Sequence, residues 1–112
     1  MTKRPQEPGV AKGSDNVFAD LGLPDAEELL AKAQLASAIS DIIDDRELTQ
    51  AEAAELLGTT QPKVSNLVRG RLEGFSLERL ARFLNSLDRD IEILVKPRPR
   101  SRERSRIRVK VG

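Results

Sequence analysis

The amino-acid sequence predicts a mainly α-helical fold that ends in a β-strand or hairpin. Aliphatic residues recur at helical spacing through the middle of the chain. Capping residues and glycines divide this region into separate helices, and a run of β-branched residues follows them. The 112 residues, 38% of them hydrophobic, are enough for one small domain with tails.

The chain is expected to begin with a disordered tail over residues 1–16, which are rich in proline, glycine and polar residues. A short apolar segment over residues 17–23 follows, and we expect it to pack on the domain in preference to a partner. Asp25 is then expected to cap a long helix, with Glu28 completing a capping box. Leucines and isoleucines recur on one face of this helix, which should run to about Arg46.

Residues 49–70, which read TQAEAAELLGTTQPKVSNLVRG, have the pattern of two short helices joined by a tight turn. Thr49 is expected to cap the first helix in a capping box, and Gly58 to end it, because glycine tolerates a positive φ. A threonine caps the second helix, Pro62 lies in its first turn and Gly70 ends it. The small and aliphatic residues expected to meet between the two helices are Ala54, Leu57, Val64 and Leu67.

The second helix of this unit carries polar side chains that suit the major groove of DNA. Glutamine and asparagine can bond two atoms of the adenine edge, and apolar groups can contact the thymine methyl group. Lysine and arginine suit phosphate oxygens, which position a protein without reading the base sequence. The predicted contact residues of this helix and the loop after it are Thr60, Gln61, Pro62, Lys63, Ser65, Asn66, Arg69 and Arg71.

A further helix is expected to start after Ser76, its N-cap, and to end near Leu87. Phe75 and Leu80 stand where a hydrophobic staple would place them. The helical domain is therefore predicted to cover residues 17–87.

Residues 88–96 are predicted to form a strand used in dimerisation. A single strand leaves its backbone groups unpaired, so it needs a partner. One candidate is the same strand of a second subunit, and the other is a possible strand over residues 106–111; both can act together in a four-stranded dimer sheet. The predicted dimerisation residues are Ile91, Ile93 and Val95.

The composition excludes several classes of function. The chain contains no histidine and no cysteine, which removes the usual general base, disulfides and thiolate metal sites. We therefore expect no enzyme activity, no metal and no cofactor. Three phenylalanines without tyrosine or tryptophan leave an aliphatic core and argue against base stacking on aromatic side chains. No run is apolar enough for a membrane span or a secretion signal, so we expect no membrane partner.

The net charge of +1 hides a strong asymmetry along the chain. Residues 15–55 contain eleven acids and two bases, a local charge of −9, whereas residues 56–96 carry +2. The C-terminal arm, residues 97–112, contains seven bases and one acid, a local charge of +6. DNA contact is therefore expected in the second half, and the first half should repel DNA or meet a basic partner. The proline- and arginine-rich arm is either a solvated linker or a phosphate contact, and both interpretations stay open.

The helix-turn-helix stretch resembles that of the Cro/CI repressor-like family, also called the XRE family. The matching residues are Leu48, Thr49, Gln50, Ala54, Leu57, Gly58, Thr59, Thr60, Gln61, Val64, Ser65, Arg69 and Gly70. The resemblance implies a lambda-repressor-like domain over about residues 27–87 that binds DNA as a dimer, with the second helix of the motif in the major groove. It also implies a phosphate contact for Gln50 and base-facing positions for Thr60, Gln61, Pro62 and Asn66. Pro62 departs from the family pattern, in which a polar residue is common at this position. The same resemblance implies a location in the cytoplasm.

Two functions from different classes remain. The first is a stand-alone, homodimeric repressor of a palindromic operator. The second follows from the segments NVFADLGLPDAEELLAKAQL and DIEILVKP, which resemble those of HigA-type antitoxins. That resemblance implies neutralisation of a RelE/HigB-like, mRNA-cleaving toxin and repression of the protein's own operon. An acidic first half is suited to a basic ribonuclease, and one face can hold DNA while another holds the toxin.

Overall fold

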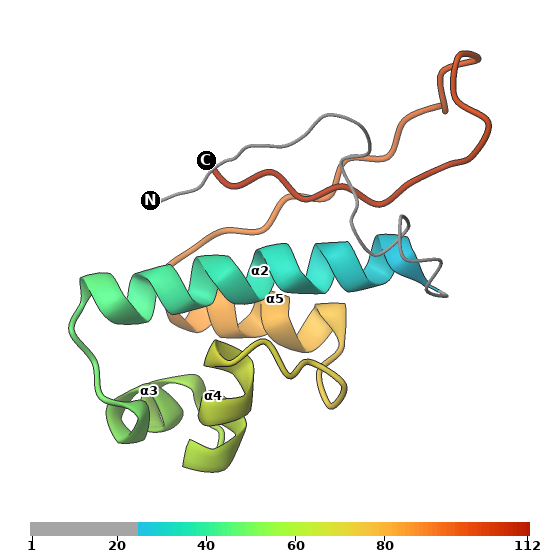
Figure 1. The fold of residues 1–112 in the computed structure, drawn as a ribbon. Coiled ribbons are helices and arrows are strands. Elements are labelled where there is room, and N and C mark those ends of the chain that lie inside the picture. Colours follow the sequence, from blue (N-terminus) through green and yellow to red (C-terminus); the bar gives the residue numbers. More distant parts are fainter. Residues whose placement is uncertain (1–24) are drawn as a thin grey trace.

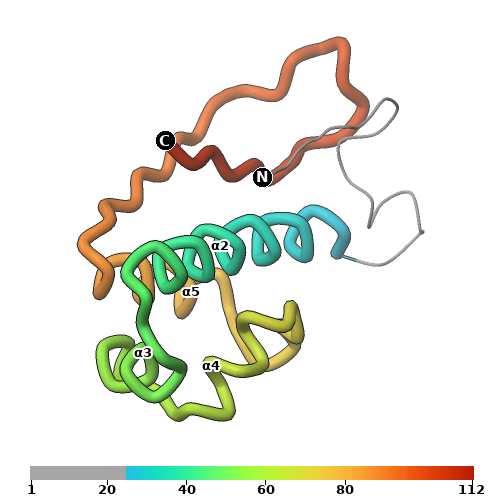
Figure 2. The backbone as a smooth tube through the Cα atoms, turned by 60° about the vertical axis from the view of Figure 1, so that its left-hand side comes forward, coloured from blue at the N-terminus to red at the C-terminus, as the bar shows by residue number. Residues whose placement is uncertain are grey.

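The computed structural model describes residues 25–112, so the expected tail and the apolar segment over residues 17–23 lie outside the described part. This part contains four helices, α2 (Ala26–Asp45), α3 (Gln50–Leu57), α4 (Gln61–Val68) and α5 (Leu77–Ser86). The long helix α2 lies against α5, while α3 and α4 form a compact unit on one side of that pair (Figure 1). The chain after α5 runs along the opposite side of α2 (Figures 1 and 2).

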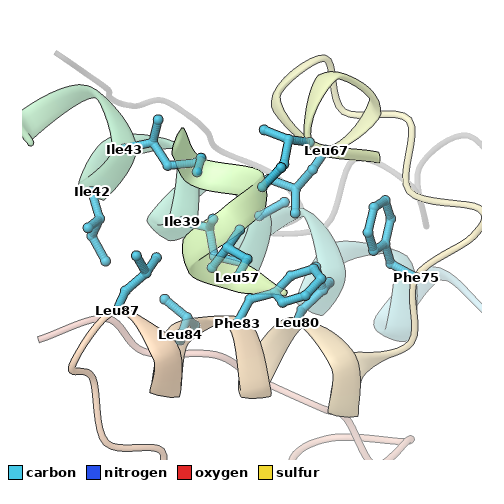
Figure 3. Close-up of a cluster of buried hydrophobic side chains, with 14 residues drawn as sticks. Ile39, Ile42, Ile43, Leu57, Leu67, Phe75, Leu80, Phe83, Leu84 and Leu87 are labelled. Atoms are coloured by element: carbon cyan, nitrogen blue, oxygen red, sulfur yellow. The ribbon is translucent and has the colours of Figure 1, made fainter. Parts of the chain in front are cut away.

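An aliphatic core joins all four helices (Figure 3). Its largest fully buried side chains come from α2, α4 and α5, and from the residue that follows α5; they are Ile39, Val64, Leu67, Leu80 and Leu87. The prediction for the two short helices is confirmed, because Ala54, Leu57, Val64 and Leu67 are all buried. Phe75 and Phe83 close the core with an edge-on contact, their ring centroids 6.1 Å apart.

The helix starts follow the sequence in three cases out of the four described. The Thr49 hydroxyl accepts a hydrogen bond from the Glu52 amide at 3.0 Å, and the Glu52 carboxylate accepts one from the Thr49 amide at 2.8 Å, which confirms the capping box. The Ser76 hydroxyl caps α5 by accepting one bond from the Arg79 amide at 3.1 Å, and the Thr60 hydroxyl caps α4 through a longer bond. The predicted cap at Asp25 is wrong. Its backbone is left-handed, with φ 55°, and its side chain makes no capping bond, because a cap needs an extended backbone to face the first turn.

The C-terminal ends of the described helices share one backbone device. Each ends in a Schellman motif, in which one residue takes a left-handed backbone, and its amide and that of the following residue donate to carbonyls of the last turn. The left-handed residues are Glu47 (φ 56°), Gly58 (71°), Gly70 (79°) and Asp88 (65°). After α4, for example, the amides of Gly70 and Arg71 donate to the carbonyls of Leu67 and Asn66 at 3.1 and 2.8 Å. The sequence predicts the two glycines but not the two acids.

The predicted C-terminal strands are absent: residues 88–112 form no β-bridge in the described chain. Both the strand over residues 88–96 and the hairpin with residues 106–111 are therefore corrected to extended, unpaired chain. The predicted dimerisation residues stand exposed, Ile91 at 38%, Ile93 at 87% and Val95 at 88%. A turn closed by a bond from the Arg102 amide to the Pro99 carbonyl, at 3.1 Å, separates two legs that do not pair. β-branched residues favour an extended backbone, but a strand also needs a neighbour to bond, and the sequence pattern alone does not supply one.

Candidate nucleic-acid interface

The α3–α4 unit holds α4 on the outside of the core. Val64 and Leu67 anchor the inner side of α4, with 1% and 2% of their surface exposed. Gly58 makes the tight turn before it with a left-handed backbone, where a Cβ would be strained. The two anchors and the turn fix which side of α4 faces solvent.

Three of the expected contact residues form a single outward row along α4 and the residue directly after it. Pro62, Asn66 and Arg69 follow one another at spacings of four and three residues, so they lie on one face, and all three are exposed. At 3.6 residues per turn, this row lies opposite the side that Val64 and Leu67 bury. The row combines an apolar ring, an amide with a donor and an acceptor, and a guanidinium group.

The remaining expected residues of α4 and its N-cap lie beside this row. Gln61 and Lys63 are exposed, and Ser65 is half-buried. Thr60 is exposed as well, but its hydroxyl also accepts a bond from the Lys63 amide at 3.4 Å. Thr60 therefore caps and positions the start of α4. Because the hydroxyl accepts this bond, its own hydrogen stays free to be donated outward.

The cations near α4 are available for phosphate. The ion pairs of the described chain lie elsewhere, joining Lys32 to Glu28, Arg46 to Asp88, and Arg82 to Glu78. Lys63, Arg69 and Arg71 are exposed, and the first turn of α4 contains no acid. Gln50 is half-buried at the first position of α3, where the helix N-terminus also favours an anion.

The structure adds one positioning residue that the sequence did not indicate. Arg46, directly after α2, donates from Nη2 to the carbonyl of Leu87 at 2.9 Å, and its guanidinium lies 3.5 Å from the Asp88 carboxylate. These contacts join the ends of α2 and α5 across 41 residues of sequence. Their sequence signal is weak, because a single arginine at a helix end has many other uses.

The described residues contain no helix that is both long and apolar enough to cross a membrane. Within the same range, no three acidic side chains come together as metal ligands do.

Comparison with known proteins agrees with this geometry. Residues 17–96 match a family model described as a helix-turn-helix domain. A solved structure described as an XRE-family transcriptional regulator is 52% identical in sequence and superposes with a TM-score of 0.74. The match covers 80% of the present chain and 100% of the other. No curated protein matches the chain.

The α3–α4 unit holds the polar face of α4 exposed on the outside of an aliphatic core. This arrangement defines a helix-turn-helix, DNA-binding protein. The chain belongs to this helix-turn-helix domain family. More narrowly, it is a member of the XRE family of DNA-binding transcriptional regulators, which are not enzymes.

Proposed function

We propose that the protein binds a palindromic operator as a homodimer and reads its sequence with α4 in the major groove. The observation that carries this proposal is the outward row of Pro62, Asn66 and Arg69, opposite the buried face of α4. Two copies of α4 related by a two-fold axis would read half-sites about 34–36 Å apart.

The side chains divide into two roles in this proposal. Gln61 and Asn66 contact base edges, because each amide can bond an adenine at two atoms, while Pro62 offers apolar contact to a thymine methyl group. Thr60, at the start of α4, lies where the resemblance places a base-facing residue. The other groups contact the DNA backbone and fix the register of α4; they are Gln50, Lys63, Ser65, Arg69 and Arg71.

The exposed segment after α5 supports the dimer. Ile91, Ile93 and Val95 alternate along an extended backbone that has no β-partner in the described chain. A second copy would satisfy the backbone groups and cover the apolar side chains at once, by pairing across the two-fold axis. Sedimentation should show a dimer that Ile93→Lys weakens and Glu92→Lys does not; an unchanged dimer would place the interface elsewhere.

Base preference tests the role of α4. Selection from a random pool of duplexes should return a palindrome, and Gln61→Ala or Asn66→Ala should lose about 1–3 kcal/mol at particular base pairs of each half-site. Ser37→Ala, an exposed change on α2, is the matched control and should bind as the wild type does. Unchanged preference in both α4 variants would remove α4 from the interface.

A second candidate function is an antitoxin that neutralises a RelE/HigB-like toxin and represses its own operon. The observation in its favour is the acidic surface of α2, where Asp41, Asp44 and Asp45 are exposed near one end and Glu28 near the other. Such a surface is complementary to a basic ribonuclease. The stand-alone repressor, with no toxin partner, is the alternative.

A neighbouring reading frame separates these two functions. A small, basic, RelE-like product encoded beside this gene should co-purify with the protein and lose its ribonuclease activity in the complex. Asp41→Asn combined with Asp44→Asn should weaken that complex and leave operator binding unchanged, because both residues lie on α2 and not on α4. A solitary gene, or a neighbour that does not bind, would leave the stand-alone repressor.

A further inference from the structure

A strict two-residue repeat of basic side chains runs through the C-terminal part of the chain. Every even-numbered position from Lys96 to Lys110 carries a lysine or an arginine, eight in all. The positions between them carry proline, serine, isoleucine or valine, and one acid, Glu103. We call this stretch the basic run.

The repeat has a geometric meaning because the basic run is mostly extended. In an extended chain, alternate side chains point to the same side and stand about 6.6 Å apart. Phosphates of one DNA strand advance about 3.4 Å each along the helix axis, so every second phosphate advances by a similar distance. A turn over residues 99–102 divides the basic run into two legs, each of which keeps the alternation.

The basic run has eight cations and one acid, Glu103, so most of its charge is uncompensated within the run. None of them forms an ion pair in the described chain. Arg98 and Arg102 donate only to the neutral carbonyls of Pro99 and Arg104, at 3.5 and 3.1 Å. Most of these side chains are exposed, and Arg102 is half-buried. A series of mostly exposed cations that form no ion pair with the described residues is a surface that attracts a polyanion.

The basic run is placed on α2 at the side away from α4. Its second leg borders a groove of about 700 Å³ together with Glu27, Leu30 and Gln34 of α2. Both views of the backbone put α3 and α4 on one side of α2 and residues 97–112 on the other (Figures 1 and 2). With α4 in a major groove, the basic run therefore faces away from that duplex.

We propose that the basic run is a second DNA-contacting surface, which binds the phosphates of a second duplex without regard to sequence. Guanidinium groups bond phosphate oxygens in pairs, and no aromatic or amide side chain of the basic run is available to read bases. One protein dimer can then hold two segments of DNA together, one through its α4 helices and one through its basic runs. The bridging rests on the proposed placement of α4, whereas phosphate binding by the basic run does not.

A capture experiment tests the bridge. The operator selected from a random pool is immobilised, loaded with full-length protein, and offered a labelled duplex of unrelated sequence. We expect capture of the second duplex at 50 mM salt, with a steep loss toward 200 mM. The test variant changes Arg100, Arg104, Arg106 and Arg108 to Gln, all at exposed positions, so the helical core is untouched. It should bind the operator and fail to capture the second duplex.

The salt dependence gives a second, independent measurement. Each phosphate contact that is lost lowers the slope of log K against log salt by about 0.9, so the four changes should lower the slope for the unrelated duplex by about 3–4. The matched control is Gln61→Ala with Asn66→Ala, which removes the amides of α4 and keeps the basic run. Its binding to the unrelated duplex should retain the full slope.

Three results would overturn the proposal. The first is wild-type protein that captures no second duplex, and the second is capture that survives the four arginine changes. In the third, the four changes lower the slope on the operator itself while no second duplex is ever captured, which would put the basic run on the same DNA as α4. A different result would separate the two proposals. If the wild-type protein showed no operator preference but still bound unrelated DNA through these arginines, the proposed function would be wrong and phosphate binding by the basic run would stand.

Discussion

The left-handed residues at the helix ends give the sharpest stability prediction. Gly58 ends α3 with φ 71°, and the amides of Gly58 and Thr59 donate to the last turn at 3.3 and 2.9 Å. A Cβ added at Gly58 would meet nothing within 4 Å, so Gly58→Ala introduces no collision and changes only the backbone preference. Gly74→Ala is the matched control, because its Cβ would also meet nothing and its φ is not positive.

Two backbone effects set the expected change in the free energy of unfolding, one in the folded state and one in the unfolded chain. Holding an L-residue with a Cβ in the left-handed region costs roughly 1–2 kcal/mol. Alanine in place of glycine also restricts the unfolded chain, which stabilises the folded state by about 0.4–1 kcal/mol. Gly58→Ala should therefore lower the free energy of unfolding by about 1 kcal/mol or slightly less. Gly74→Ala should raise it by a few tenths of a kcal/mol or more. The converse change, Glu47→Gly, removes the strain at φ 56° and should be neutral or stabilising by up to about 1 kcal/mol.

Thermal unfolding followed by circular dichroism measures all three variants. For a domain of this size, about 1 kcal/mol shifts Tm by roughly 4–8 °C, so Gly58→Ala and Gly74→Ala should move Tm in opposite directions. Equal shifts for the two alanine variants would refute the reasoning, because they would show that the sign of φ does not decide the cost. A destabilised Glu47→Gly would refute it independently.

Three further predictions concern the core, a cap and the interface. Leu80→Ala, at a side chain with no exposed surface, should cost about 2–5 kcal/mol in denaturant unfolding, whereas Leu56→Ala, 43% exposed, should cost far less; similar values would contradict the buried position of Leu80. Thr49→Ala removes one bond of the capping box and should cost about 0.5–2 kcal/mol, while Thr49→Ser should recover most of it. Arg71→Ala should weaken binding to all duplexes alike and lower the salt slope by about 1; a change confined to one sequence would assign Arg71 a base contact instead.

The helical part of the fold is predictable from the sequence because its signals are local. Thr49, Ser76 and Gly58 act on backbone groups within three or four residues, so their effect does not depend on the rest of the chain. The buried face of each helix is equally local, since spacing alone places Leu80 and Phe83 inward.

The errors fall where a residue's role depends on something outside its own segment. Asp25 has the side chain of a cap, but its backbone is left-handed and its side chain makes no capping bond. The sequence predicts that helices end near Arg46 and Leu87, but it does not predict that Glu47 and Asp88 take the left-handed backbone that favours glycine. The alternation over residues 91–95 indicates an extended backbone, yet whether a strand forms depends on a partner that the sequence of one chain does not contain.

The contacts between the C-terminal ends of α2 and α5 bear on the relation between the two DNA-contacting surfaces that we propose, α4 and the basic run. The amides of Asp88 and Arg89 bond back to α5 at 3.1 and 3.0 Å, and Arg46 donates to the Leu87 carbonyl from the end of α2. The Arg46–Asp88 ion pair is mostly exposed and adds little by itself, so the directed bond to the carbonyl is the stronger restraint. Leu87 is also fully buried, so the chain leaves the domain from an anchored point. From there it runs along the side of α2 away from α4, so dimer pairing and phosphate binding by the C-terminal segment need not compete with α4 for the same duplex.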